Sequence, residues 1–98
     1  MRSIGEMLRQ LREEQKQLLR EVAAGIKIDQ ALLSKIERGE RVPNKEQVLK
    51  LAKYFNAEKN ELIVALLSDR IVNELVDEDL AEEALKIARQ KIENKKSK

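Results

Sequence analysis

Apolar residues recur at helical spacing along most of the chain and predict a series of short amphipathic helices. Within residues 4–11 they fall three and four positions apart, and Ser3 with Glu6 has the capping-box pattern of a helix start. A polar run over 13–17 follows. It separates this first helix from a second one, which we expect near residues 18–26.

Capping residues mark the next two helices. Asp29 is a good N-cap for a third helix, and Gly39 is a good residue to end it. After a loop, Asn44 with Gln47 repeats the capping-box pattern, and Asn56 can end the helix that follows. The apolar stripe of this fourth helix is Val48, Leu51, Ala52 and Phe55.

The last third of the chain also has a helical pattern. A fifth helix is expected from about Glu58, and the apolar pattern resumes after residues 68–69. A final helix carries the apolar residues of 80–92, and residues 94–98 are expected to fray. The acidic residues 77–79 would lie at the N-terminus of that helix, where its dipole favours negative charge.

Composition excludes several classes of function. The 98 residues contain no His and no Cys, which removes thiol and imidazole catalysis and the ordinary zinc and haem sites. The longest apolar run, over 62–67, is far short of the roughly 20 residues that cross a bilayer, and the first six residues have no signal-peptide segment. We therefore expect a cytoplasmic all-α protein with no cofactor, no small-molecule ligand and no membrane attachment. Its carboxylates form no cluster typical of an enzyme.

Charge is distributed unevenly along the chain. The formal net charge is +2, but residues 1–56 hold 12 basic and 8 acidic side chains, whereas residues 57–98 hold 8 basic and 10 acidic ones. A basic first half is consistent with an anionic partner, although ordinary surface scatter explains the same difference.

The second and third expected helices, over about 19–38, have the pattern of two short helices joined by a tight turn. The positions that would pack inside are Val22, Ala23, Ile26, Ile28, Leu33 and Ile36. The positions that would face outward from the second helix of the pair are Gln30, Ala31, Ser34, Lys35 and Arg38. An amide can contact the edge of adenine, and Lys can reach guanine. This pattern fits a helix that enters the DNA major groove, or else an aliphatic hairpin within another bundle.

Residues 4–62 resemble the Cro/repressor-type helix-turn-helix regulators, also called xenobiotic-response-element-like. The matching segments are IG at 4–5, LRE at 11–13, LSKIERGERVP at 33–43, VLKLA at 48–52 and NEL at 60–62. The resemblance implies a compact five-helix DNA-binding domain over residues 1–68 with a recognition helix at about 29–38. Residues 69–98 would then be a C-terminal helical extension, used for packing or dimerisation, with a frayed basic tail.

The family's residue roles can be transferred where the sequence matches. The resemblance implies that the base-reading positions are Gln30, Ala31 and Lys35. It implies that Ser34, Arg38, Arg41 and Lys45 are DNA-backbone positions, and we expect Arg20 and Lys27 to join them for the reasons given next. Arg12 and Glu37 match a pair that forms an internal ion pair in the family, which assigns Glu37 to the scaffold.

Three positions depart from the family pattern. Leu19 stands where the family usually has a phosphate-binding Gln, so Arg20 would replace that contact. Lys27 occupies a turn position that is commonly Gly. In a left-handed conformation Lys costs roughly 1–2 kcal/mol relative to Gly, but it offers a cation near the DNA. Leu32 is large for a helix face near the backbone, and we expect it to pack against a neighbouring loop.

These features predict a sequence-specific transcriptional regulator that binds double-stranded DNA without chemistry, nucleoid-associated when bound. A homodimer on a palindromic operator is expected, because one recognition helix reads only a few base pairs. Residues 69–98 would either pack back on the domain or meet a second chain. Autoregulatory or controller-like proteins are the favoured subclass. The alternative is a protein-interaction module, antitoxin-like or bound to an enzyme subunit, with little DNA binding.

Overall fold

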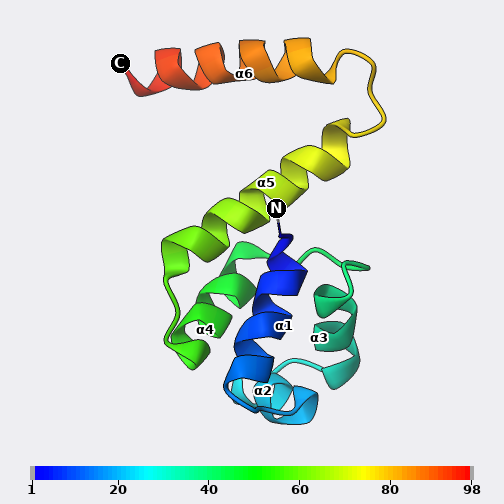
Figure 1. The fold of residues 1–98 in the computed structure, drawn as a ribbon. Coiled ribbons are helices and arrows are strands. Elements are labelled where there is room, and N and C mark those ends of the chain that lie inside the picture. Colours follow the sequence, from blue (N-terminus) through cyan, green and yellow to red (C-terminus); the bar gives the residue numbers. More distant parts are fainter. Residues whose placement is uncertain (1, 98) are drawn as a thin grey trace.

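The computed structural model describes residues 2–97, which form six α-helices and no strand (Figure 1). The all-α class expected from the sequence is confirmed. The helices are α1 (Ile4–Glu14), α2 (Leu19–Gly25), α3 (Gln30–Glu37), α4 (Lys45–Phe55), α5 (Lys59–Leu75) and α6 (Ala81–Lys96).

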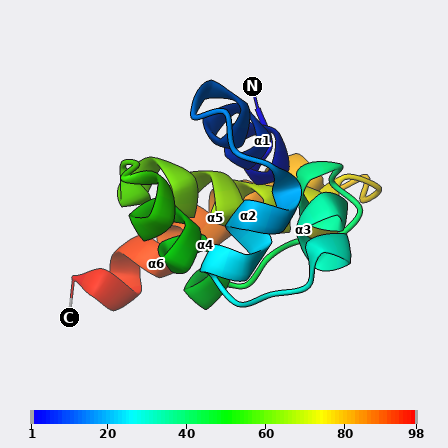
Figure 2. The same cartoon turned by 90° about the horizontal axis from the view of Figure 1, so that it is seen from below.

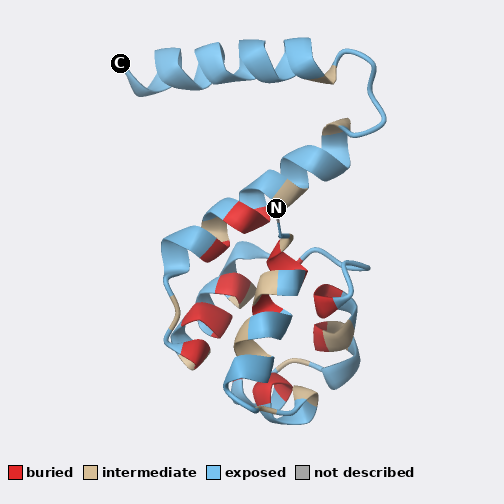
Figure 3. Ribbon diagram, viewed as in Figure 1, coloured by how far each residue is buried: buried red, intermediate tan, exposed pale blue. Residues whose placement is uncertain are grey.

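The core lies between α1, α2, α3, α4 and the first half of α5 (Figure 3). Its buried side chains are almost all aliphatic, with Phe55 as the single aromatic ring among those nearly inaccessible to solvent. The fully inaccessible centre is Val22, Val48, Leu51 and Leu66. These positions belong to the apolar stripes that the sequence shows, so the same periodicity that predicts the helices also assembles them around one core.

Two capping boxes predicted from the sequence are present. Ser3 Oγ accepts a hydrogen bond from the backbone N–H of Glu6 at 3.2 Å, and Asn44 Oδ1 accepts one from the N–H of Gln47 at 2.7 Å. Asp29 does stand at the N-cap of α3, but its side chain makes no capping hydrogen bond. The first turn of α3 therefore has no side-chain oxygen on its backbone N–H groups.

The first four helices all end in the same way, with one residue in the left-handed region. These residues are Lys16 (φ 55°), Lys27 (φ 60°), Gly39 (φ 77°) and Asn56 (φ 54°). At each one, the backbone N–H donates to the carbonyl three residues back, and the next N–H donates to the carbonyl five residues back. This is the Schellman arrangement, which satisfies the last carbonyls of a helix and turns the chain sharply. It produces the short connections that hold α2 and α3 close together.

In the C-terminal third of the chain, the helices differ from those predicted from the sequence. α5 continues through residues 68–69 without a break, so the apolar pattern on both sides of that point belongs to one helix. α6 begins at Ala81, which leaves the acidic residues 77–79 in the connection rather than in the first turn. The expected fraying from Asn94 is wrong, because α6 stays helical through Lys96.

α6 lies apart from the rest of the molecule. Figure 1 shows it turning back after α5 without joining the packed body, which it only overlaps in the view of Figure 2, and none of its residues is buried. The radius of gyration is 15.5 Å, whereas about 13 Å is typical of a compact domain of 100 residues. The C-terminal helix is therefore an arm rather than a part of the core.

Candidate nucleic-acid interface

α2 and α3 pack against each other as a helix-turn-helix pair. One buried cluster joins the two helices. It contains Val22 and Ala23 of α2, the C-cap residue Ile26, and Leu33 and Ile36 of α3. The turn between the helices holds Lys27 in the left-handed region, at the position where the family commonly has Gly. The pair is thus fixed from its inner side and leaves its outer side open.

α3 is sharply divided into an inner and an outer face. Leu33, Ile36 and Glu37 are buried, whereas Gln30, Ala31 and Lys35 are exposed. Ser34 is half-buried between the two faces. The three positions predicted to read bases therefore lie together on the solvent side of the helix that the fold presents.

The basic residues expected at a DNA backbone lie on the elements just before and just after α3 in the sequence. Arg20 on α2, Lys27 in the turn, Arg41 in the loop after α3 and Lys45 at the start of α4 are all exposed. Cations at such positions can meet phosphates without carrying sequence information.

Arg38 differs from these residues because it already has an anionic partner. Its Nε lies 2.6 Å from Glu40 Oε2, and both side chains are about half exposed. An exposed pair of this kind is worth little, so a phosphate can displace the carboxylate at small cost.

Arg12 and Glu37 form a nearly inaccessible ion pair that ties α1 to the end of α3. Arg12 Nε and Nη2 donate to the two carboxylate oxygens of Glu37 at 2.8 and 2.9 Å, and Nη1 donates to the Gln17 carbonyl at 3.0 Å. The side chains are 14% and 5% exposed. The hydrogen bonds that Arg12 donates to the Glu37 carboxylate raise the pKa of Arg12 above its ordinary value. This geometry makes the pair part of the support beneath α3, not part of its outer face.

The two leucines that depart from the family pattern are both used for packing. Leu19 and Leu32 are partly buried against the hydrophobic core. Leu32 therefore packs on the core cluster, whereas we expected it to meet a loop. Because the Leu19 side chain is apolar and packs on the core, it cannot make the phosphate contact that a Gln amide would make at this position.

Two lysines on α4 belong to the same basic region and were not singled out from the sequence. Lys50 and Lys53 line a shallow depression of about 230 Å³ together with Lys27 and Tyr54. Their spacing of three residues on a helix was a usable signal, but only the fold shows that α4 brings them beside the turn after α2.

Polar contacts also fix the linker between α1 and α2. Tyr54 Oη donates to Gln17 Oε1 at 2.7 Å, and Gln15 Nε2 donates to the Phe55 carbonyl at 2.8 Å. Gly25 is required here, because a Cβ at this position would overlap the Tyr54 ring. α2 is thereby held against α4 both before its first residue and at its last one.

A compact helical domain with a helix-turn-helix pair, an open second helix and surrounding cations defines a DNA-binding protein of the helix-turn-helix class. The chain belongs to the helix-turn-helix domain family, which matches residues 5–65. This confirms the resemblance to the Cro/repressor-type regulators. No curated protein matches the chain. Among residues 2–97, no helix has the length and apolar character to span a membrane, and no group of three or more acidic side chains is arranged to hold a metal ion.

Proposed function

We propose that this chain is a sequence-specific transcriptional regulator that places α3 in the major groove of a palindromic operator. Gln30, Ala31 and Lys35 would read base edges, and the surrounding cations would fix the register on the phosphates. The observation that carries the proposal is the division of α3, whose inner side is buried in the core while the predicted reading positions are exposed.

The proposal includes a homodimer and an autoregulatory or controller-like role in the cytoplasm. Two copies related by a two-fold axis would place two recognition helices one helical turn of DNA apart, about 34 Å. A palindromic site would then be recognised by both copies at once, which gives more discrimination than one helix can.

Selection of bound DNA from a random-sequence pool tests this function directly. We expect a palindrome with an inverted repeat, and we expect affinity for it to fall steeply as salt rises, because phosphate contacts release counterions. A pool that keeps no common sequence, with binding equal to that of any duplex, would contradict sequence-specific recognition.

Two substitutions separate reading from positioning. Gln30→Ala should relax base preference at one position of each half-site, with a discrimination loss of about 1–3 kcal/mol. Arg38→Ala should weaken all duplexes alike and reduce the salt slope by about 1 for each copy bound. Matched controls are Gln90→Ala, an exposed amide on α6, and Arg9→Ala. Arg9 is an exposed arginine paired with Glu13 at 3.5 Å, much as Arg38 is paired with Glu40. Unchanged binding by both test variants would show that α3 is not the reader.

The second candidate function is a protein-interaction module. The apolar surface along α5 and α6 favours it, because helices of this kind can dock another protein. The same selection experiment distinguishes the two functions. A module would leave the DNA pool unenriched at low and high salt alike.

A further inference from the structure

Exposed apolar side chains are concentrated on one part of the molecule. Of the 12 large hydrophobic residues exposed among residues 2–97, nine lie on α5, α6 and their connection. They are Val64, Leu67, Ile71, Val72, Val76, Leu80, Leu85, Ile87 and Ile92. Nine exposed large apolar side chains on two successive helices are more than single scattered residues, and such a concentration marks an interaction site.

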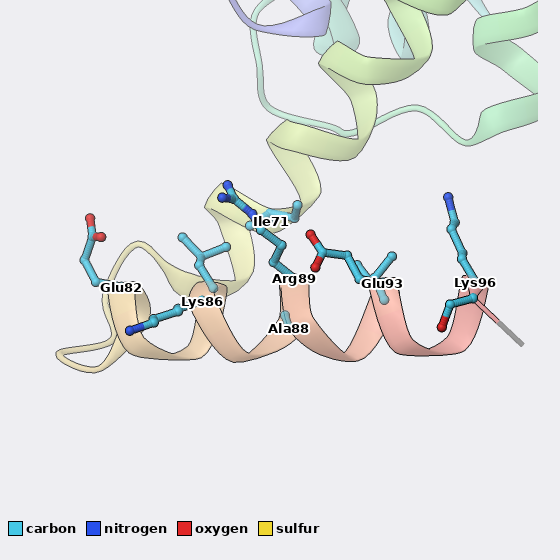
Figure 4. Close-up of a pocket in the computed structure, with 10 residues that line it drawn as sticks. Ile71, Glu82, Lys86, Ala88, Arg89, Glu93 and Lys96 are labelled. Atoms are coloured by element: carbon cyan, nitrogen blue, oxygen red, sulfur yellow. The ribbon is translucent and has the colours of Figure 1, made fainter.

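α6 has little tertiary support in the single chain. It has 16 residues and buries none of them, and helices of about this length are marginal in water without tertiary packing. Between α5 and α6 lies an open groove of about 1000 Å³, lined by Ile71 on one side and by Leu85, Ala88 and Ile92 on the other. In Figure 4, Ile71 projects from α5 on the side of α6 from which Arg89 and Glu93 extend. The groove is open to solvent and apolar side chains line both of its walls, so a second chain can enter it and bury them.

The apolar pattern of α6 indicates what the occupant is. Ala81, Leu85, Ala88 and Ile92 follow one another at spacings of four, three and four residues, the seam of a coiled coil. A second α6 can lie antiparallel to the first with the midpoints of the two seams aligned. Leu85 of each copy then faces Ala88 of the other, and Ile92 of each copy faces Ala81 of the other. Each layer then pairs one large side chain with one small one, which lets two helices interdigitate closely.

Charge supports the same antiparallel orientation. Residues 77–83 carry five acidic side chains and no basic one, whereas residues 86–96 carry five basic and one acidic. The same midpoint that pairs the apolar residues brings Glu82 opposite Lys91 of the other copy. Two helices side by side in parallel would instead place like charges together, which is unfavourable.

We propose that α6 is a dimerisation arm that packs antiparallel against α6 of a second copy and closes the groove beside α5. This inference rests on the proposed homodimer and assigns its interface. The arrangement is two-fold symmetric, so one surface serves both copies and the assembly stops at two chains. Because the arm lies outside the helix-turn-helix core, dimerisation and the folding of the DNA-binding unit can be altered separately.

Sedimentation without DNA tests the interface independently of any DNA binding. The chain should sediment at twice its mass of 11.3 kDa. Leu85→Glu should raise the dimer Kd at least about 100-fold, because each dimer would bury two unpaired carboxylates. Leu49→Glu is the matched control. Leu49 on α4 is 39% exposed and Leu85 is 40% exposed, yet only Leu85 lies on the arm. Circular dichroism should show that the helix-turn-helix domain of both variants remains folded, with any loss of helicity in Leu85→Glu no larger than the 16 residues of α6 account for.

Cross-linking tests the orientation. The chain has no Cys, so Ala81→Cys and Ile92→Cys each introduce a single thiol. After the two variants are mixed and allowed to exchange, oxidation should join Cys at 81 to Cys at 92 and leave each variant alone uncrosslinked. A tag on one variant identifies the mixed product by mass.

Several outcomes would overturn the proposal. A monomer at micromolar concentration, a dimer that Leu49→Glu dissociates and Leu85→Glu does not, or self-crosslinking of each Cys variant would each contradict the antiparallel arm. A monomeric chain that still selects a DNA sequence would refute the arm alone. A dimeric chain that selects no sequence would refute the proposed function and keep the arm.

Discussion

The ion pair beneath α3 allows a quantitative test of how the reading helix is supported. Arg12→Met removes the guanidinium and leaves the Glu37 carboxylate, only 5% exposed, without its two charged hydrogen bonds. Breaking a buried pair in this way costs about 3–5 kcal/mol. Since a small domain is stable by only about 5–15 kcal/mol, this single change should remove a large part of its stability.

The reverse substitution should cost less. Glu37→Met leaves Arg12 at 14% exposed with its hydrogen bond to the Gln17 carbonyl intact, and a long arginine can extend its charged end to water. We expect a loss of about 1–3 kcal/mol. The double variant, with two Met side chains, removes both charges and should be within about 1 kcal/mol of the parent chain, because apolar replacement of a buried pair is often neutral.

Urea denaturation followed by circular dichroism measures all four members of this cycle. The raised pKa of Arg12 fixes the pH range. The stability that the raised pKa of Arg12 contributes is fully present below the ordinary arginine pKa and is lost only in strong alkali, so titration of Arg12 does not complicate measurements near neutrality. The control is Arg9→Met, which breaks an exposed pair and should change stability by less than about 1 kcal/mol. Strictly additive losses in the double variant would refute the reasoning.

Two further predictions follow from the backbone. Gly5→Ala should destabilise the fold by about 2–3 kcal/mol, because its Cβ would overlap the Ile36 carbonyl and push α1 away from α3. Gly39 has open space around it but a φ of 77°, so Gly39→Ala should lose only about 1 kcal/mol in the same urea titration. Lys16→Gly and Lys27→Gly should each stabilise the chain by about 0.5–1 kcal/mol, because both replace a left-handed lysine. Only Lys27→Gly should also weaken DNA binding in a gel shift, and equal binding by the two variants would exclude a phosphate role for Lys27.

Local patterns were sufficient to predict most of the domain. Ser3 and Asn44 cap α1 and α4 as expected, and Asn56 ends α4 in the left-handed conformation. These features depend on residues three or four positions apart, where one side chain and the nearby backbone decide the outcome. Asp29 shows the limit of such reasoning, because it occupies the N-cap of α3 without using its carboxylate there.

Features that depend on tertiary contacts were not predictable from the pattern. The continuation of α5 past Ser68 is one example. Asp69 Oδ2 accepts a hydrogen bond from the backbone N–H of Ile4 at 2.8 Å, across 65 residues of sequence, and so holds this helix at the N-terminus of α1. Lys50 and Lys53 are another example, since only the fold brings α4 beside Lys27.

The cations of this protein differ in whether, and how strongly, they are paired with carboxylates. This difference explains how a chain of almost zero net charge can bind a polyanion. Arg12 is consumed in the scaffold by Glu37, and Arg38 is paired with Glu40 at the surface, where the pairing is weak. Lys27, Lys50 and Lys53 line one depression, and the pairing of Lys50 with Glu46 at 3.3 Å is as exposed as that of Arg38, so an anion can compete for it at small cost. The attraction to a duplex would therefore arise from the local arrangement around the helix-turn-helix pair, and not from the total of +2.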